Sequence, residues 1–76
     1  MNAIRRKSLR EVIEILENAK ELIESLKDEE SEAWDNIPES LQNTEQCEKL
    51  ENNVGCLENA VDSLDDCMNE IISAIE

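Results

Sequence analysis

The sequence contains no His, Phe or Tyr, and it has only one Trp, one Gly and one Pro. Without histidine the chain lacks the side chain that most often serves as a general base, so nucleophilic and acid–base catalysis are not expected. With a single aromatic residue, any core must be built from Leu, Ile, Val and Ala. The single Gly and the single Pro leave few points at which regular structure would be interrupted.

Cysteine is also scarce, and the spacing of the three cysteines argues against a fold held together by disulfides or by a metal ion. Cys47, Cys56 and Cys67 are odd in number and lie 9 and 11 residues apart, which fits reduced thiols on a helix better than a disulfide framework. A structural zinc site takes four ligands, commonly in close pairs, and three distant thiols do not provide them. We therefore expect no metal, no cofactor and no catalytic residue, with Cys47 and Cys67 acting as small apolar side chains.

Acidic residues dominate the charge, since 20 Asp and Glu accompany 7 Lys and Arg for a net charge of −13. Arg5, Arg6, Lys7 and Arg10 precede every acid, so only 3 bases remain among the 20 acids from residue 11 onward. Such a surface repels nucleic acid and anionic membrane, and direct binding to either is not expected. Acids also interrupt the apolar residues that follow the basic run, so neither a signal peptide nor a membrane span is predicted and the expected location is cytoplasmic.

Two segments carry apolar residues at alternating intervals of three and four, which is the pattern of a coiled-coil seam. Because proline disfavours helical geometry at the residue before it, Pro38 should separate two helices. We predict one helix over about 4–36, a turn over about 37–43 and a second helix over about 44–75, all within a single domain, 1–76. The expected seam comprises Leu9, Val12, Leu16, Ala19, Ile23, Leu26, Ala33, Cys47, Leu50, Val54, Leu57, Val61, Leu64, Met68 and Ile71. The fold class is therefore all-α, an antiparallel two-helix coiled-coil hairpin.

The helix ends have recognisable signals. Ser8 could cap the first helix, although residues 3–7 could equally continue it. The first helix should stop near Asn36, whose side chain tolerates a left-handed cap. Either Asn43 or Thr44 should cap the second helix.

The position of the turn predicts how the helices are aligned. If the turn is centred near residue 40, residues whose numbers add to about 80 lie opposite each other. This register places Leu26 opposite Val54, and it places Arg10 beside Glu70. The basic N-terminal residues would then lie near the negative end of the antiparallel partner helix.

Further apolar residues lie just outside the seam and make each apolar face wider than a two-helix contact can cover. They are Ile13, Ile15, Leu22, Ala60, Cys67 and Ile72. A chain of this length with few large side chains is also near the lower limit for folding alone. We therefore expect two hairpins to pack face to face as a homodimer with four helices, with a different partner protein on the same face as the alternative.

The segment around the proline is a second candidate site, consisting of Trp34, Asn36, Ile37, Pro38 and Leu41. In one interpretation Trp34 closes the end of the bundle by packing on its apolar neighbours. In the other it anchors a partner protein, since a Trp beside a rigid turn is a typical hot spot. The first interpretation is favoured, and burial of the indole distinguishes the two.

The run from Ala33 to Gln42, with the sequence AWDNIPESLQ, resembles a group of short, acidic, helical hypothetical proteins from Gram-positive bacteria and their phages. In that group an aromatic residue precedes Asp-Asn, an aliphatic residue, Pro-Glu-Ser, a second aliphatic residue and Gln, usually followed by Ser-Glu. This chain departs from the pattern with Asn43-Thr44-Glu45. The resemblance covers roughly the second half of the chain. It implies a bacterial or phage origin and a helical hairpin, and nothing about catalysis.

Three functions are consistent with these features. The leading hypothesis is a non-enzymatic homodimeric hairpin that works by binding another protein. The second is an inhibitor that imitates nucleic acid and occupies the basic groove of a host or defence protein, and the third is a structural or assembly scaffold. Because acidic helices are common, charge alone does not select the second.

Overall fold

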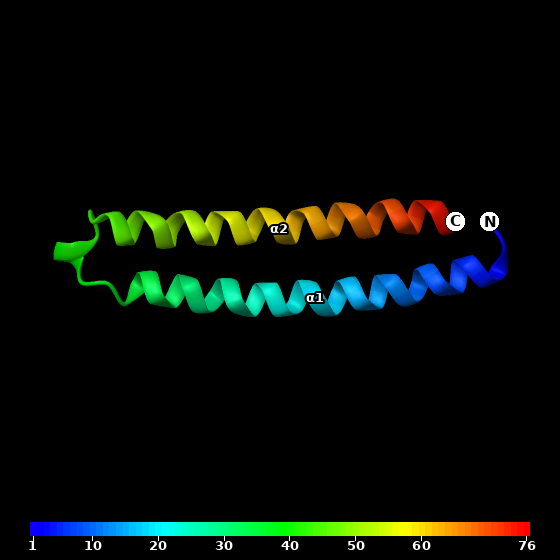
Figure 1. The fold of residues 1–76 in the computed structure, drawn as a ribbon, viewed down its shortest axis with the longest axis horizontal. Helices are drawn as coiled ribbons and strands as arrows, with labels where there is room; N and C mark the ends of the chain where they lie inside the picture. Colours follow the sequence, from blue (N-terminus) through cyan, green and yellow to red (C-terminus); the bar gives the residue numbers. More distant parts are fainter.

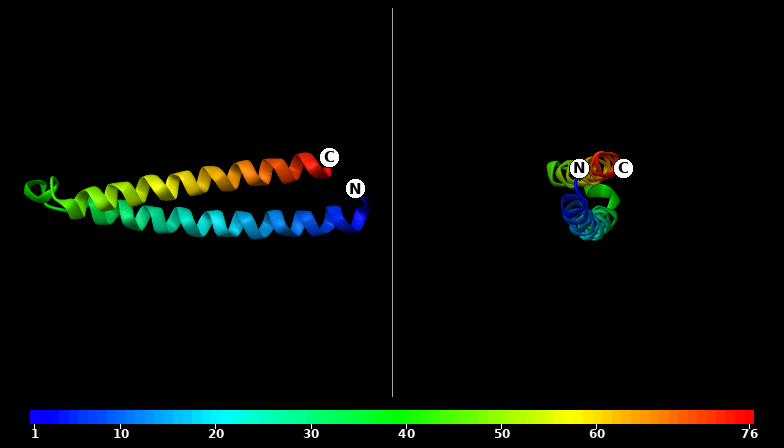
Figure 2. Two further views of the ribbon diagram at one scale, coloured as in Figure 1. Left: turned by 45° about the horizontal axis from the view of Figure 1, so that its top comes forward. Right: turned by 90° about the vertical axis from the view of Figure 1, so that its right-hand side faces the viewer.

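The computed structural model describes residues 1–76 and contains only helices. Helix α1 spans Ala3–Asp35, the single 3₁₀ turn η1 spans Glu39–Leu41, and helix α2 spans Glu45–Ile75. The two long helices pack antiparallel, with the connection at one end and both termini at the other (Figure 1). The predicted all-α hairpin is confirmed. Its Cα atoms extend over 59 × 15 × 12 Å, which makes the molecule a rod one layer thick (Figure 2).

The caps of helix α1 are Asn2 at its start and Asn36 at its end. Asn2 is the N-cap, and its side chain accepts a hydrogen bond from the backbone N–H of Arg5 at 2.8 Å. Residues 3–7 therefore continue the helix, and the capping role considered for Ser8 is wrong. Asn36 is the C-cap, as expected, and its φ of −82° and ψ of −5° are right-handed, so the left-handed cap that its side chain would tolerate is not used. Its N–H still bonds to a carbonyl of the last turn, and Pro38, which has no N–H, follows two residues later.

The start of α2 is tied to the connecting segment by one side chain. The hydroxyl of Thr44 accepts a hydrogen bond from the N–H of Cys47 at 3.4 Å and donates one to the carbonyl of Leu41 at 2.8 Å. Thr44 is thus confirmed as the N-cap, and it links α2 to η1. Beyond this point α2 runs without interruption through Gly55, which has a negative φ.

The seam of α2 agrees with the prediction at every position. Cys47 and Met68 are the only two buried residues of the chain. The other predicted seam residues of α2 are all partly buried: Leu50, Val54, Leu57, Val61, Leu64 and Ile71. Two helices that share a single contact face cannot enclose a larger core.

The contact face of α1 lies further round the helix than predicted. Four of its expected seam residues are partly buried, namely Leu9, Leu16, Ala19 and Ile23. Val12 and Leu26 are 38% and 47% exposed, Ala33 is exposed as well, and the seam prediction is wrong for these three. The residues one position later, Ile13, Lys27 and Trp34, are partly buried instead, and so is Lys20. Lysine fits such a position because its aliphatic chain lies along apolar surface while its ammonium reaches water.

The helices are also displaced along each other. Lys20 Nζ lies 2.7 Å from Asp65 Oδ1, and Asn53 Nδ2 donates a hydrogen bond to Glu30 Oε2 at 3.3 Å. The paired residue numbers add to 85 and 83 instead of the predicted 80, so the offset is about one helical turn. Figure 1 shows the reason, since the connecting segment runs outward and α2 begins beyond the last turn of α1.

Candidate interaction surfaces

Side chains that do not face the partner helix divide the hairpin into two long sides. Successive residues of an α-helix are rotated by about 100° around its axis. Each helix therefore has two further stripes of residues, one on either side of the stripe that contacts the partner helix. In an antiparallel pair, each stripe of α1 shares a side of the hairpin with one stripe of α2. The two sides differ sharply in chemistry.

The first side, which we name the acidic side, carries two rows of carboxylates. A groove between the helices on this side is lined by Ile13, Glu17, Lys20, Glu21, Glu24, Asp65, Met68, Asn69 and Ile72. Helical spacing extends the α1 row to Glu14 and Asp28 and the α2 row to Glu58 and Asp62. The acidic side thus comprises Glu14, Glu17, Glu21, Glu24 and Asp28 of α1 and Glu58, Asp62, Asp65 and Asn69 of α2. One lysine, Lys20, lies among these acids.

The Lys20 ammonium is held by its acidic neighbours. Its hydrogen bond with Asp65 is the main cause that raises the pKa of Lys20 above 10.5, and the charges of Asp65, Glu24 and Glu17 act in the same direction against partial desolvation. Lys20 therefore stays protonated and joins α1 to α2 at the floor of the groove. Lys20 Nζ also lies 4.0 Å from Glu24 Oε1, and Lys27 Nζ lies 3.9 Å from Asp28 Oδ1. The other five carboxylates of the acidic side form no ion pair.

The opposite side, which we name the apolar side, has large side chains on α1 and small ones on α2. The α1 stripe consists of Val12, Ile15, Ala19, Leu22 and Leu26, and the α2 stripe consists of Cys56, Ala60, Ser63, Cys67 and Ala74. Ile15 and Leu22 are 65% and 64% exposed. A hollow that spans the helices is lined by Glu30, Asn53, Cys56 and Leu57, which places the Cys56 stripe on the side away from the acidic groove. The hydroxyl of Ser63 donates to the carbonyl of Asn59 and so has a partner within its own helix.

The residues predicted for the oligomer interface fall on both sides. Ile15, Leu22, Ala60 and Cys67 lie together on the apolar side. Ile13 and Ile72 instead line the acidic groove, so one flat interface cannot include all six. Val12 and Leu26 also belong to the apolar side, although the sequence predicted them in the seam. Their spacings of three and four residues from Ile15 and Leu22 could have indicated that these four residues share one stripe.

The tryptophan and the residues of the turn line different hollows, although the N–H of Ile37 donates to the carbonyl of Trp34 at 3.1 Å. A hollow of about 390 Å³ is lined by Asn36, Ile37, Pro38, Leu41, Thr44 and Gln46. Trp34 lines a different hollow, together with Ser31 of α1 and with Glu51 and Val54 of α2. Its Nε1 atom is buried and has no hydrogen-bond partner. The indole therefore faces α2, which favours a role in holding the hairpin together.

The basic N-terminal residues form no ion pair. The guanidinium of Arg6 donates to the carbonyl of Met1 at 2.7 and 3.2 Å, and the ion pairs of the chain involve only Lys20 and Lys27. The expected pairing of Arg10 with Glu70 is wrong, because the register offset of about one turn moves these residues apart.

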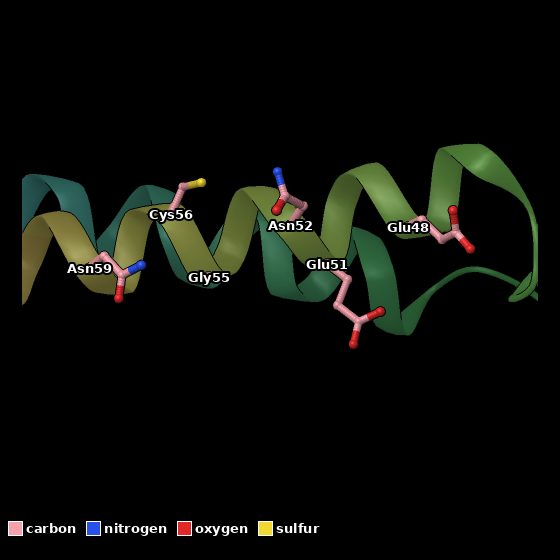
Figure 3. Close-up of a pocket in the computed structure, with 6 residues that line it drawn as sticks. All are labelled: Glu48, Glu51, Asn52, Gly55, Cys56 and Asn59. Carbon is pink, nitrogen blue, oxygen red and sulfur yellow. The ribbon is translucent and has the colours of Figure 1, made fainter.

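One more hollow belongs to α2 alone. It is lined by Glu48, Glu51, Asn52, Gly55, Cys56 and Asn59. Figure 3 shows that these side chains spread in different directions instead of converging on one point. A Cβ atom placed on Gly55 would meet nothing within 4 Å, so the hollow is open surface beside this residue.

The remaining candidates for chemistry are isolated. All three cysteines are free, with Cys47 buried and Cys56 and Cys67 exposed. No three His, Cys, Asp or Glu side chains are grouped as a metal ion would require. Neither long helix combines the length and the apolar character needed to cross a membrane. Comparison with models of known families finds no match, and searches of curated proteins and of solved structures find none either.

Proposed function

We propose that the protein is a non-enzymatic homodimer that acts by binding another protein. The observation that supports this proposal is the division of the hairpin into an apolar side and an acidic side. The apolar side suits self-association, because it exposes Ile15 and Leu22 by 65% and 64% while the hairpin buries only two residues. The acidic side suits a partner with a basic surface.

The charge density of the acidic side defines the partner's chemistry. Five carboxylates of α1 lie between Glu14 and Asp28, a distance of about 21 Å at 1.5 Å per residue. Three more from α2 lie along the same stretch. A surface with matching Lys and Arg residues would be attracted at long range, and the association rate would fall as salt screens the charges.

A second candidate function, imitation of nucleic acid, is favoured by the arrangement of these carboxylates in two parallel rows. Lys20 and Lys27 offset two of the eight carboxylates, which leaves roughly one net negative charge per 3.5 Å over about 21 Å, compared with about one per 1.7 Å in duplex DNA. The rows lie on adjacent helices, whose axes are typically about 8–10 Å apart. In this case the partner is a host or defence protein that normally binds DNA or RNA. The resemblance of the turn to bacterial and phage proteins supports such a cytoplasmic setting.

The partner can be sought by affinity capture from the native host with matched variants. Glu17→Gln, Glu21→Gln and Glu24→Gln together remove three charges from the acidic side. The control removes three charges from exposed positions elsewhere, with Glu29→Gln, Glu48→Gln and Asp66→Asn. Both triple variants have the same net charge, so a difference between them reports the location of the contact.

The expected result is that the first triple variant loses the partner and the control retains it. The affinity of the wild-type protein should fall as salt concentration rises, and competition by duplex DNA or RNA would identify the nucleic-acid mimic. Equal capture by both triple variants, or affinity that does not change with salt, would show that the acidic side is not the binding surface.

A further inference from the structure

The apolar side has a feature that specifies how a second copy lies on it. All of its large residues lie on α1, where Ala19 is the one small member of the stripe, and all of its α2 residues are small. We propose that two hairpins pack apolar side against apolar side with their turns at the same end, so that α1 of each copy lies against α2 of the other. This inference rests on the proposed homodimer.

Symmetry leaves two ways to place one apolar side on another. A two-fold axis parallel to the helices puts both turns at one end and places α1 against α2 of the partner subunit. A two-fold axis across the helices puts the turns at opposite ends and places α1 against α1 and α2 against α2. The first arrangement brings large residues onto small ones. The second brings large onto large along one edge and small onto small along the other.

Side-chain size decides between them, because the side chains at the contact set the distance between helix axes. In the second arrangement the α1 helices would be held apart by Leu22 and Ile15, while the α2 helices would need to approach closely to bring Ala60 near its neighbours. In the first arrangement both contacts are the same and have equal spacing. Neighbouring helices are antiparallel in both arrangements, so the helix dipoles do not distinguish them and side-chain size does.

The observed register makes the first arrangement fit residue by residue. A two-fold axis parallel to the helices keeps every residue at its own level, so the numbers of facing residues again add to about 84, as they do within the hairpin. Leu22 then falls between Ala60 and Ser63 of the partner subunit. Leu26 falls between Cys56 and Ala60 of the partner subunit. Large residues seated between small ones correspond to the knobs-into-holes packing of helical bundles.

The apolar side is long enough to form a dimer contact. Its α2 stripe from Cys56 to Ala74 is about 27 Å long at 1.5 Å per residue. Two adjacent helices make it about 18 Å wide, so it covers on the order of 500 Å² per copy, compared with about 800 Å² from each partner in a standard interface. Ile4, which is 78% exposed, adds apolar surface beyond the stripe of α1. The match of its own large and small stripes favours a second copy over an unrelated partner.

The arrangement can be tested by measuring one distance in the full chain. The three cysteines are replaced by alanine, and Ser40→Cys in η1 supplies a single site for a spin label. Light scattering first establishes that the labelled protein is a dimer, and pulsed electron spin resonance then gives the distance between the two labels. We expect roughly 20–25 Å, about two helix diameters. Labels at opposite ends would instead be separated by nearly the 59 Å length of the rod.

A label at Glu21→Cys, near the middle of α1, controls for dimer formation because both arrangements give it a similar distance. A dimer whose Ser40→Cys labels are far apart overturns the same-end arrangement and leaves the proposed homodimer standing. A monomeric wild-type protein overturns both. If the cysteine replacements weaken folding, the buried Cys47 is kept and only the exposed Cys56 and Cys67 are replaced, which leaves Ser40→Cys as the accessible labelling site.

Discussion

Replacement of Gly55 by alanine should stabilise the hairpin. Gly55 lies inside α2 with a negative φ, and a Cβ atom added there would meet nothing within 4 Å. Glycine in a helix interior costs about 1 kcal/mol relative to alanine, because its backbone loses more freedom on folding. With no steric cost to offset this gain, Gly55→Ala should raise the free energy of unfolding by about 1 kcal/mol.

Thermal unfolding followed by far-ultraviolet circular dichroism measures the effect. For a domain of this size, about 1 kcal/mol corresponds to a rise of roughly 4–8 °C in the melting temperature. In a homodimer the change occurs twice in a molecule twice as large, so the shift is similar. Asn52→Ala, at an exposed position of the same segment, is the control and should give a smaller increase. A lower melting temperature for Gly55→Ala would refute the continuous, open helix at this point and would indicate a kink or a close contact.

Two further predictions concern the contacts between the helices. Lys20→Met should lower the melting temperature at neutral pH, because it removes the ion pair with Asp65. The pKa of Lys20 is raised above 10.5, so its contribution is present below that pH and is lost as the pH rises through the folded-state pKa; melting curves should converge there, and a constant difference would contradict the assignment. Trp34→Ala should cost about 2 kcal/mol in urea unfolding, since the indole is only partly buried. Trp34→Phe should cost less than about 1 kcal/mol, because the lost indole N–H has no partner. Unchanged stability of both Trp34 variants with loss of partner binding would identify an anchor instead.

The seam of α2 could be read from the sequence because its large apolar residues form a single stripe. Leu50, Val54, Leu57 and Leu64 repeat without competition, and the second stripe of that helix contains only small residues. The sequence also limited the N-cap of α2 to Asn43 or Thr44, because these short polar side chains directly precede the apolar repeat. Local signals were sufficient where one face was clearly the most apolar.

The contact face of α1 could not be read in the same way. Its apolar residues cover two stripes, one through Ile13 and Leu16 and one through Ile15 and Leu22, and the predicted seam lay between them. In the hairpin the first stripe meets α2 and the second faces outward. When apolar residues cover such a wide face, their periodicity selects the middle of the face. In a four-helix bundle that middle would point toward the centre of the bundle, and not directly at α2. The predicted alignment of the two helices was wrong by about one turn, because the spacing of apolar residues does not show that the connecting segment runs outward beyond α1.

The proposed dimer has a consequence for the acidic side. When two apolar sides are joined, the two acidic sides lie on opposite outer faces of the bundle. The molecule then presents two equivalent binding surfaces, and we expect two copies of a basic partner per dimer. Titration calorimetry at low salt measures this ratio once the partner is identified.

The molecular mass in solution tests most directly whether the apolar side joins two copies. Light scattering should give about 17 kDa for the wild-type protein, twice the chain mass of 8.7 kDa. Leu22→Glu on the apolar side should reduce the mass to that of one chain, because it places a charge in the interface. Ser25→Glu, which adds the same charge at an exposed position outside that side, should leave the dimer intact. A wild-type protein that is helical and has the mass of a single chain would contradict the account.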